Sequence, residues 1–499
     1  HRRQRRSGQQ LMARTSLTLL LAALTCAGAA QAQDIAPLPG PVPAAGEAVE
    51  APSGPLLLDE VLASSARAAP QVIEALARIR VAEGRALSAE GAFDTVFEVD
   101  GDARPVGYYE GAEVSARARR PLPNNGGYLY GGYDVSRGRF APYYGNYYTD
   151  RLGELSVGGL FSLLRDRMVD ERRTQRNVAA RGIDIARFEQ ELTALGVQFR
   201  AVVAYQDWVA TGLRLRAYQS LLDLAESRRS AIVRQVELGA QPEILLTEND
   251  QNLVRRRALV TQARGELAAA ATALSLYYRD AAGQPVTVSR DRLPPDATAL
   301  AGVAAAITAD WTQSRPELQV LLAQVDQANA QLALAENDLR PRLDLRGDLS
   351  QDFGAQSLGG STYGELEAIV GFQFSFPLQN RAARGRVDQA LAEIDALAAR
   401  SRYLRDQIAV EVEGITVRVD AARQLAAIAD QERQLAERLA QAERRRFELG
   451  SSDFFLVNQR EETATDAQVR LIDAQVRIAT AGAELAAATA DRSALGLLR

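Results

Sequence analysis

One short pattern of residues occurs twice in this chain, and the second copy lies 213 positions after the first. Val157–Leu163 alternates in polarity, and Val370–Phe376 repeats the alternation. Each segment precedes a long helical run that ends in Glu-Leu-Gly, at Gly239 in the first copy and at Gly450 in the second. Period-two alternation is typical of a strand, and repetition at a fixed distance indicates a duplicated structural unit. The chain is therefore constrained to two copies of strand, long helix and turn.

The first 32 residues have the features of a secretory signal peptide. Five arginines accompany an apolar stretch over residues 17–25, and Ala30–Ala32 fits a small-x-small cleavage site. We therefore expect export and a mature chain that begins at Gln33, with Met12 as an alternative start. A lipidated Cys26 is a second interpretation, but the flanking residues favour simple cleavage.

The expected signal contains the only cysteine and the only histidine of the chain, and its loss takes the formal charge from −5 to −10. An acidic mature chain does not indicate a nucleic-acid partner. Without cysteine and histidine, the sequence predicts no disulfide, no imidazole catalysis, no metal site and no cofactor. Acidic residues of the predicted helices lie three or four positions from arginines, as Glu437 does from Arg433, which is typical of solvated helix faces. We therefore predict that the protein is not an enzyme.

Strand patterns occur four times within about residues 93–164 and twice more, at about 342–350 and 368–377. Each has an apolar face and a polar face. A soluble sandwich would need partner sheets, whereas the rest of the chain is helical in pattern. Nine of the fifteen tyrosines lie in residues 108–148, where the aromatic belts and loops of an outer-membrane barrel would be. The pattern favours a membrane β-barrel, with these candidate lipid-facing residues: Val157, Phe161, Val370, Phe372, Phe374 and Phe376.

Two long helices are predicted over residues 165–238 and 381–449, and neither contains proline. At about 1.5 Å per residue, each would extend for about 100 Å. Apolar positions of the first recur at spacings of three and four from Leu192 to Leu213, which is typical of a coiled coil. The shorter helices are predicted over residues 56–90, 243–278, 316–339 and 453–490.

These elements divide the chain into a first repeat over residues 56–280 and a second over 311–499. Residues 281–310 are the predicted link between the repeats, because glycine and proline interrupt the periodicity there. Residues 33–55 are rich in proline, alanine and glycine, and we expect a flexible lead-in.

This layout resembles the TolC-like outer-membrane efflux protein family over essentially the whole mature chain. The most specific match lies in the second repeat, where Arg315-Pro316-Glu317-Leu318 begins a helix and Pro341-Arg342-Leu343 leads from helix to strand. Phe447-Glu448-Leu449-Gly450 is similar to the segment before the family's hairpin tip. The first repeat has a weaker equivalent at Ala69-Pro70, which lacks the charges.

The resemblance implies an internally duplicated α+β membrane protein that forms a homotrimer. Three chains would combine their strands in one outer-membrane β-barrel, continued by a long periplasmic α-helical coiled-coil barrel. Physical reasoning agrees, because the few strands of one chain cannot close a barrel and an unpaired strand edge is not tolerated in lipid. The first repeat has an extra pair of strand patterns, so either the barrel has additional strands or one hairpin lies outside the membrane.

In this family, an aspartate ring a few residues beyond the hairpin glycine closes the periplasmic tip. The matching positions of this chain are Leu456 and Gln459, so the aspartates are not preserved there. Asp453 in the second repeat, and Glu243 and Glu248 in the first, are the nearest acidic residues. All five are gate candidates, although a carboxylate in the first turn of a helix also complements the helix dipole.

The two Leu-Gly turns resemble the tip grooves where a periplasmic adaptor docks in this family. Leu238, Gly239, Leu449 and Gly450 are therefore the candidate docking residues. An alternative is that the two glycines serve only the turns, since glycine suits a left-handed helix end.

The prediction is an outer-membrane channel, the passive exit duct for solutes or polypeptides in a tripartite efflux or type I secretion system. Its expected partners are two further copies of the chain, a periplasmic adaptor, an inner-membrane pump and outer-membrane lipid. The expected location is the outer membrane of a Gram-negative bacterium, with a large periplasmic portion. The alternative is a periplasmic coiled-coil scaffold or adaptor protein with a soluble β-domain, against which the phenylalanine-faced strands argue.

Overall fold

The computed structural model of the chain describes residues 54–140, 149–300, 303, 315–355 and 365–497. The predicted signal peptide and nearly all of the lead-in lie outside the described residues, as does most of 301–314, at the end of the link and the start of the second repeat. The first repeat contains α2 (Leu58–Ala68), α3 (Pro70–Glu90), β1 (Val96–Arg104), β2 (Gly111–Pro121), β3 (Tyr128–Gly138), β4 (Gly153–Ser162), α4 (Glu171–Glu237) and α5 (Ile244–Leu274). The second contains α6 (Pro316–Asn337), β5 (Arg342–Phe353), β6 (Glu367–Ser375), α7 (Arg381–Glu448) and α8 (Phe454–Ala488).

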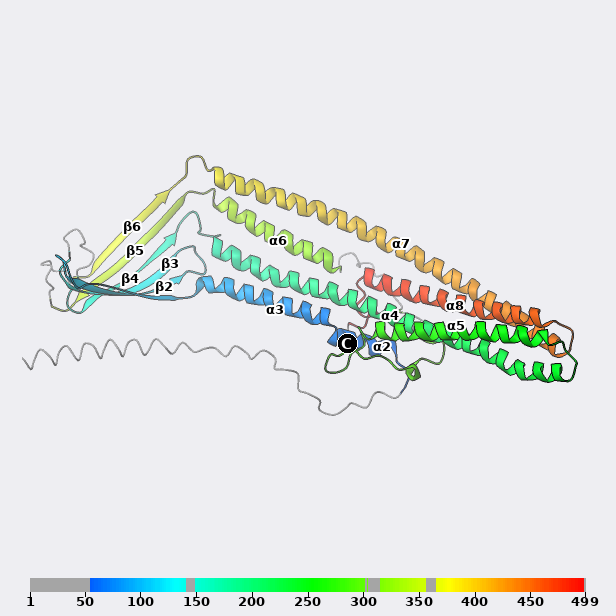
Figure 1. The fold of residues 1–499 in the computed structure, drawn as a ribbon. Coiled ribbons are helices and arrows are strands. Elements are labelled where there is room, and N and C mark those ends of the chain that lie inside the picture. Colours follow the sequence, from blue (N-terminus) through cyan, green and yellow to red (C-terminus); the bar gives the residue numbers. More distant parts are fainter. Residues whose placement is uncertain (1–53, 141–148, 301–302, 304–314, 356–364, 498–499) are drawn as a thin grey trace, which may run out of the picture. The chain divides into compact units, whose positions relative to one another are not determined.

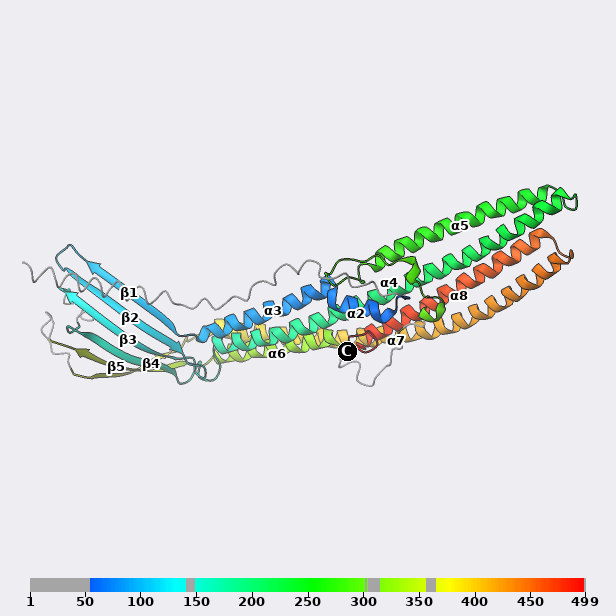
Figure 2. The same cartoon turned by 90° about the horizontal axis from the view of Figure 1, so that it is seen from below.

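All six strands form one antiparallel sheet in the order β1-β2-β3-β4-β5-β6 (Figures 1 and 2). The repeats join where β4 pairs with β5, with Val157 opposite Leu349. The hairpin of β2 and β3 lies within the sheet, because β2 pairs with β1 and β3 pairs with β4. The extra strand patterns of the first repeat are therefore part of the same sheet as the others.

The strand register brings the apolar faces of all six strands to one side. Val114 of β2 lies opposite Val135 of β3, and Leu345 of β5 lies opposite Phe372 of β6. The other side carries charged residues, where Asp134 lies opposite Glu154. One sheet face is thus apolar from edge to edge, and its opposite face is polar.

The helices next to the sheet lie in the same lateral order as the strands to which they are joined. Contacts run from α3 to α4, from α4 to α6 and from α6 to α7. Farther from the sheet, α5 returns along α4 and α8 returns along α7, and α8 also contacts α4 (Figures 1 and 2). None of the described helices combines the length and apolar composition required to cross a bilayer.

The principal core lies where α2, α4 and the link between the repeats meet. Trp208 and Tyr205 of α4 are buried there with Leu293 of the link. The Tyr205 hydroxyl donates a hydrogen bond to the Leu56 carbonyl oxygen at 2.9 Å, and burial raises the pKa of Tyr205 to about 12. Gly212 lies against Leu293 so closely that a Cβ atom would approach a leucine methyl to 2.3 Å. The predicted link therefore contributes to the core over its described residues.

Three helix ends differ from the sequence expectations. The first long helix begins at Glu171, six residues after the predicted start, because the Asp170 carboxylate accepts a hydrogen bond from the Arg173 amide at 3.0 Å. The following return helix ends at Leu274 rather than at residue 278. The leading helix is interrupted at Ala69, whose extended backbone precedes Pro70, the first residue of α3.

Candidate functional site

The two hairpin ends have the same backbone geometry. The Gly239 amide donates to the Val236 carbonyl and the Ala240 amide to the Gln235 carbonyl, at 2.9 and 2.8 Å. Gly450 and Ser451 make the equivalent pair of bonds, at 2.9 and 2.8 Å. Both glycines have positive φ angles, +69° and +74°. These are two Schellman motifs, and they explain why glycine occurs at both positions.

The turns expose apolar side chains. Leu238 and Leu449, the two candidate docking leucines, are 76% and 82% exposed. Ile244 and Phe455, each just beyond a turn, are exposed as well. A rigid turn that carries exposed apolar groups can bind an apolar partner with little loss of conformational entropy.

The gate candidates lie in two groups on different hairpins. Asp453, Leu456 and Gln459 are at or near the start of α8, and Glu243 and Glu248 are at the start of α5. The Asp453 carboxylate accepts a hydrogen bond from the Leu456 amide at 2.6 Å, so it caps α8. Among the described residues, no hydrogen bond or ion pair joins the two groups.

A buried charged cluster lies behind the turns, where four helices meet. Glu461 of α8 is fully buried and pairs with Arg228 of α4, Arg256 of α5 and Arg444 of α7. The Arg256 guanidinium is 3.4 Å from the Glu461 carboxylate and also donates to the Leu221 carbonyl oxygen at 2.8 Å. This arrangement connects the α4–α5 hairpin to the α7–α8 hairpin through one carboxylate.

Neighbouring groups complete the charged cluster. The Asn458 side-chain oxygen accepts hydrogen bonds from Arg228 at 3.0 Å and from Arg256 at 3.2 Å. Arg228 also lies over the rings of Phe447 and Phe454, at 5.9 and 5.8 Å. Burial lowers the pKa of Arg256, although the nearby Glu461 opposes the shift.

Sequence reasoning did not find this cluster, because its members lie on four helices and share no sequence spacing. A weak signal was present, since the chain contains no lysine and all 58 basic residues are arginine. A guanidinium group donates several hydrogen bonds in a fixed plane, which suits it to buried pairs. Which of the many arginines would be buried depended on helix packing.

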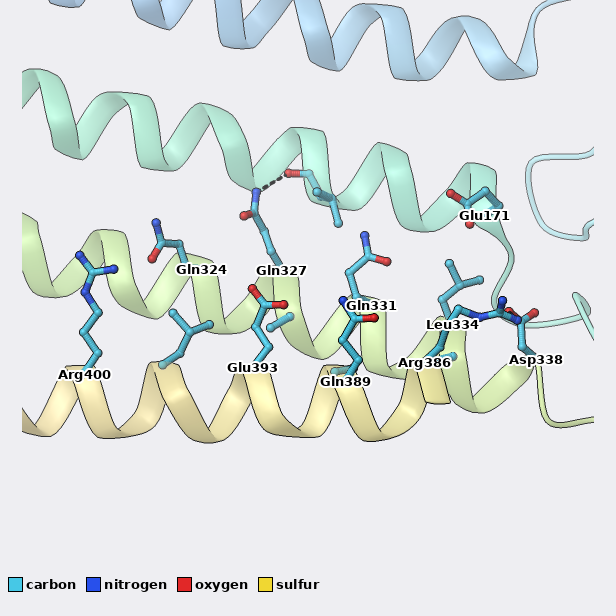
Figure 3. A pocket seen from close by; sticks show the side chains of 15 residues that line it. Glu171, Gln324, Gln327, Gln331, Leu334, Asp338, Arg386, Gln389, Glu393 and Arg400 are labelled. Atoms are coloured by element: carbon cyan, nitrogen blue, oxygen red, sulfur yellow. Dashed lines mark hydrogen bonds and ion pairs between the residues drawn. The ribbon is translucent and has the colours of Figure 1, made fainter. Parts of the chain in front are cut away.

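A polar groove lies between α4, α6 and α7, near the sheet. Its volume is about 800 Å³. Figure 3 shows Gln324, Gln327 and Gln331 of α6 extending toward α4, where Gln327 donates a hydrogen bond to the Val178 carbonyl oxygen at 2.8 Å, while Gln389 and Glu393 extend from α7. The groove can hold water and polar solutes, and none of the predicted site residues lines it.

The candidate lipid-facing residues share the apolar side of the sheet. The register places Val157 and Phe161 in β4 on the same side as Val370, Phe372 and Phe374 in β6. Val370 and Phe372 are 78% and 79% exposed. Phe376, also exposed, lies one residue beyond the end of β6.

The described part of the chain contains no group of three acidic, histidine or cysteine residues that could hold a metal ion.

Comparison with known proteins finds a sequence match over part of the chain and a similar fold over most of it. Residues 309–491 match the family described as outer membrane efflux protein. None of the curated proteins matches the chain.

Solved outer-membrane channels have a similar structure over most of the chain. The outer-membrane channel OprN is 18% identical, with a TM-score of 0.61 over 87% of this chain and 89% of that one. The CmeC outer membrane channel of Campylobacter jejuni is 15% identical, with a TM-score of 0.59 over 89% and 87% of the two chains. The open state of the MtrE outer membrane channel of Neisseria gonorrhoeae is 13% identical, with a TM-score of 0.62 over 88% and 89%.

The structural similarities show the fold of the chain, and the sequence match to the outer membrane efflux protein family is confined to residues 309–491. The mixed architecture of sheet and long helical hairpins agrees with both. The chain is therefore similar in sequence over residues 309–491, and in fold over most of its length, to the TolC-like outer-membrane efflux proteins, as its motifs indicated.

Proposed function

We propose that this protein is an outer-membrane efflux channel with a periplasmic helical portion, the passive exit duct of a tripartite efflux or type I secretion system. The observation that carries the proposal is the sheet, whose apolar face is exposed from β1 to β6 while its opposite face is charged. A transmembrane barrel requires this contrast, because one face contacts lipid and the other contacts water. The candidate lipid-facing residues of β4 and β6 are then part of the lipid contact.

The channel would be a closed ring of copies, because a single chain leaves two open edges of different composition, and the family resemblance makes it a homotrimer. β1 and α3 form one edge, and β6 and α7 form the other. The edge helix α7 carries a row of exposed apolar residues: Tyr403, Val410, Val417, Leu425, Ile428, Leu435 and Leu439. Contact between unlike edges of neighbouring copies closes a ring when the rotation permits, and such contact would bury this row.

The hairpin ends are the proposed contact with a periplasmic adaptor, which would connect the channel to an inner-membrane pump. Leu238 and Leu449 are exposed beside Gly239 and Gly450, so their burial by an apolar partner would be favourable. Nothing in the charged cluster or the groove supplies energy or chemistry, so transport energy would come from the pump.

Membrane fractionation and electrical recording test the proposal together. We expect the mature protein in the outer-membrane fraction, and we expect discrete channel conductance after its reconstitution in planar bilayers. Recovery in the soluble periplasm, without conductance, would favour the rival scaffold with a soluble β-domain. The membrane channel and the soluble scaffold differ in what covers the exposed apolar face of the sheet, which is lipid in the channel.

The gate assignment has a separate test at the start of α8. Leu456→Asp introduces a carboxylate at a family gate position, and three copies around the axis would attract cations. We expect a smaller conductance and new sensitivity to divalent cations. Asp453→Asn is the matched control, since Asp453 caps α8 and its loss should affect helix stability more than current. Unchanged current in Leu456→Asp would reject the alignment, and Gln459, Glu243 and Glu248 would be tested next.

A further inference from the structure

The β2–β3 hairpin lies between β1 and β4 in the sheet, in the position of strands that form part of a barrel wall. Each of β1, β4, β5 and β6 is joined directly to one helix of the layer formed by α3, α4, α6 and α7. β2 and β3 are joined to no long helix, yet they separate β1 from β4 in the sheet. A hairpin outside the membrane would leave β1 and β4 paired with each other, and they are not paired.

Both faces of this hairpin continue the faces of its neighbours. On the apolar side, Val114 lies opposite Val135, and Gly131 on the same face of β3 lies opposite Val157 of β4. On the polar side, each of the six strands carries one carboxylate near the end remote from the helices: Asp102, Glu113, Asp134, Glu154, Asp352 and Glu367. A shift by one residue would reverse both faces, so the agreement depends on the whole register.

We propose that β2 and β3 are membrane-spanning strands, so that each protomer contributes six strands and the exit pore is wide enough for cargo of polypeptide size. The inference rests on the proposed trimeric channel. Three six-stranded sheets would close as one barrel of eighteen strands. With strands about 4.8 Å apart and tilted by about 40°, the barrel diameter is about 36 Å, against about 24 Å for twelve strands.

The helical layer matches the wider barrel. Three copies of the layer α3-α4-α6-α7 would make a ring of twelve helices. Helices about 9.5 Å apart in such a ring give a diameter of about 36 Å. The two added strands therefore bring the barrel to the width of the helical ring, with no constriction between them.

The width identifies a class of cargo. A pore about 36 Å across at the strand backbones remains open after side chains line both walls, whereas small solutes need no such width. An unfolded or partly folded polypeptide would pass through it. The polar side of the sheet, with a carboxylate on every strand, would keep the pore wall wet.

Paired cysteine substitutions test whether β2 spans the membrane. Val114→Cys and Arg117→Cys lie on opposite faces of β2, and Arg117 is exposed on the polar side; both are made in a Cys26→Ala chain without other cysteines. In outer membranes, we expect Arg117→Cys to react with a charged, membrane-impermeant thiol reagent at least about tenfold faster than Val114→Cys, because an apolar environment suppresses thiolate formation. A lipid-soluble maleimide should label Val114→Cys.

The matched control is an equivalent pair on β6, Phe372→Cys on the apolar side and Gln373→Cys on the polar side. If β6 alternates in reactivity and β2 does not, the wide barrel is rejected and the channel proposal stands. If neither strand alternates, the membrane barrel itself is rejected. Alternation in both strands supports six membrane strands per protomer.

Deletion of residues 111–138 tests the pore width. It removes β2 and β3, and β1 can then pair with β4 in the antiparallel sense already required by their connections. Trimer edges remain unchanged. For neutral polymers added from the barrel side of a planar bilayer, we expect the largest admitted diameter to fall by about a third. The same size limit in both proteins would overturn the proposal.

Discussion

Glu461 is the residue through which four helices meet near the hairpin ends. Its carboxylate is fully buried and accepts contacts from Arg228, Arg256 and Arg444, each on a different helix. A buried pair of this kind contributes little net stability relative to apolar packing, but removal of one partner is costly because the other charges stay buried. The cluster therefore specifies how the hairpins fit together.

Glu461→Gln should destabilise the protein by about 3 kcal/mol, because the buried Arg256 guanidinium loses its counter-charge. The control is Glu462→Gln, the neighbouring residue, whose ion-pair partner Arg255 is largely exposed. That change should cost less than about 1 kcal/mol. Denaturant unfolding of the two variants measures the difference, and equal losses would show that burial of Glu461 is unimportant.

A second polar cluster connects α2 to the link between the repeats. Arg292 donates to the Glu60 carboxylate at 2.7 Å, and the Tyr278 hydroxyl donates to it at 2.5 Å. Burial tends to raise the pKa of Glu60, but the hydrogen bonds from Arg292 and Tyr278 outweigh it and lower the pKa. The ionised form is thus favoured in the folded state.

Because the pKa of Glu60 is lower in the folded state than in the unfolded chain, ionised Glu60 stabilises the fold. This stabilisation is fully present above the pKa of an unfolded glutamate, and it is lost as the pH falls through the pKa of the folded state. At neutral pH, Glu60→Gln should cost about 1 kcal/mol, since partial exposure screens the pair. The stability difference from the unmodified protein should narrow in acid. Glu74→Gln, in an exposed pair with Arg78, should show little difference at any pH. A constant Glu60→Gln difference across the pH range would contradict this account.

At the scale of elements, the two long hairpins depend on identical helix ends. Gly239 and Gly450 both adopt left-handed backbone conformations in open space, where a Cβ atom would meet no other atom. Substitution there is opposed by backbone strain alone. Each turn also places an exposed leucine beside the glycine, so turn geometry and the proposed adaptor contact are linked.

Gly239→Ala and Gly450→Ala should each cost about 1 kcal/mol, the strain of a left-handed non-glycine residue. Gly265→Ala is the matched control, because Gly265 lies inside α5 with no neighbour near its Cβ position. That change should instead stabilise the protein by about 0.5–1 kcal/mol through helix propensity. Thermal unfolding distinguishes them, and a destabilised Gly265→Ala variant would show that local conformation does not control these positions.

At the scale of the whole molecule, the unpaired edges are the dominant feature. The sheet ends at β1 and β6, and the helical layer next to it ends at α3 and α7. Val410 and Val417, seven residues apart on α7, are 70% and 64% exposed in the single chain. A seven-residue apolar repeat is the pattern by which helices pack against partner helices.

Val410→Glu combined with Val417→Glu should abolish the trimer, because two charges per chain would be buried in each contact. Leu322→Glu is the control, since Leu322 is exposed on α6, which has neighbours on both sides and forms no edge. Native mass spectrometry of the extracted proteins reports the copy number. Trimers of the double variant would place the subunit contact elsewhere.

Much of the architecture could be predicted from periodicity. Alternation in Val370–Phe376 and the turn glycines at 239 and 450 marked a strand face and two helix ends, because these signals depend on neighbours in sequence. The start of α4 was misplaced by six residues, because the cap formed by Asp170 carries a weaker signal than the apolar pattern around it. The exact end of a helix depends on its local cap, which the periodicity of the helix interior does not reveal.

The sequence by itself determined the duplicated strand, helix and turn, the resemblance to outer-membrane efflux proteins, and the apolar face of each strand. Only the tertiary structure decided that β2 and β3 lie inside the sheet, and that Arg228, Arg256 and Arg444 converge on Glu461. The physical reason is the separation in sequence over which the relevant interactions act. Periodicity and turn chemistry act over a few residues, whereas strand order and the burial of a charge depend on contacts between segments up to hundreds of residues apart.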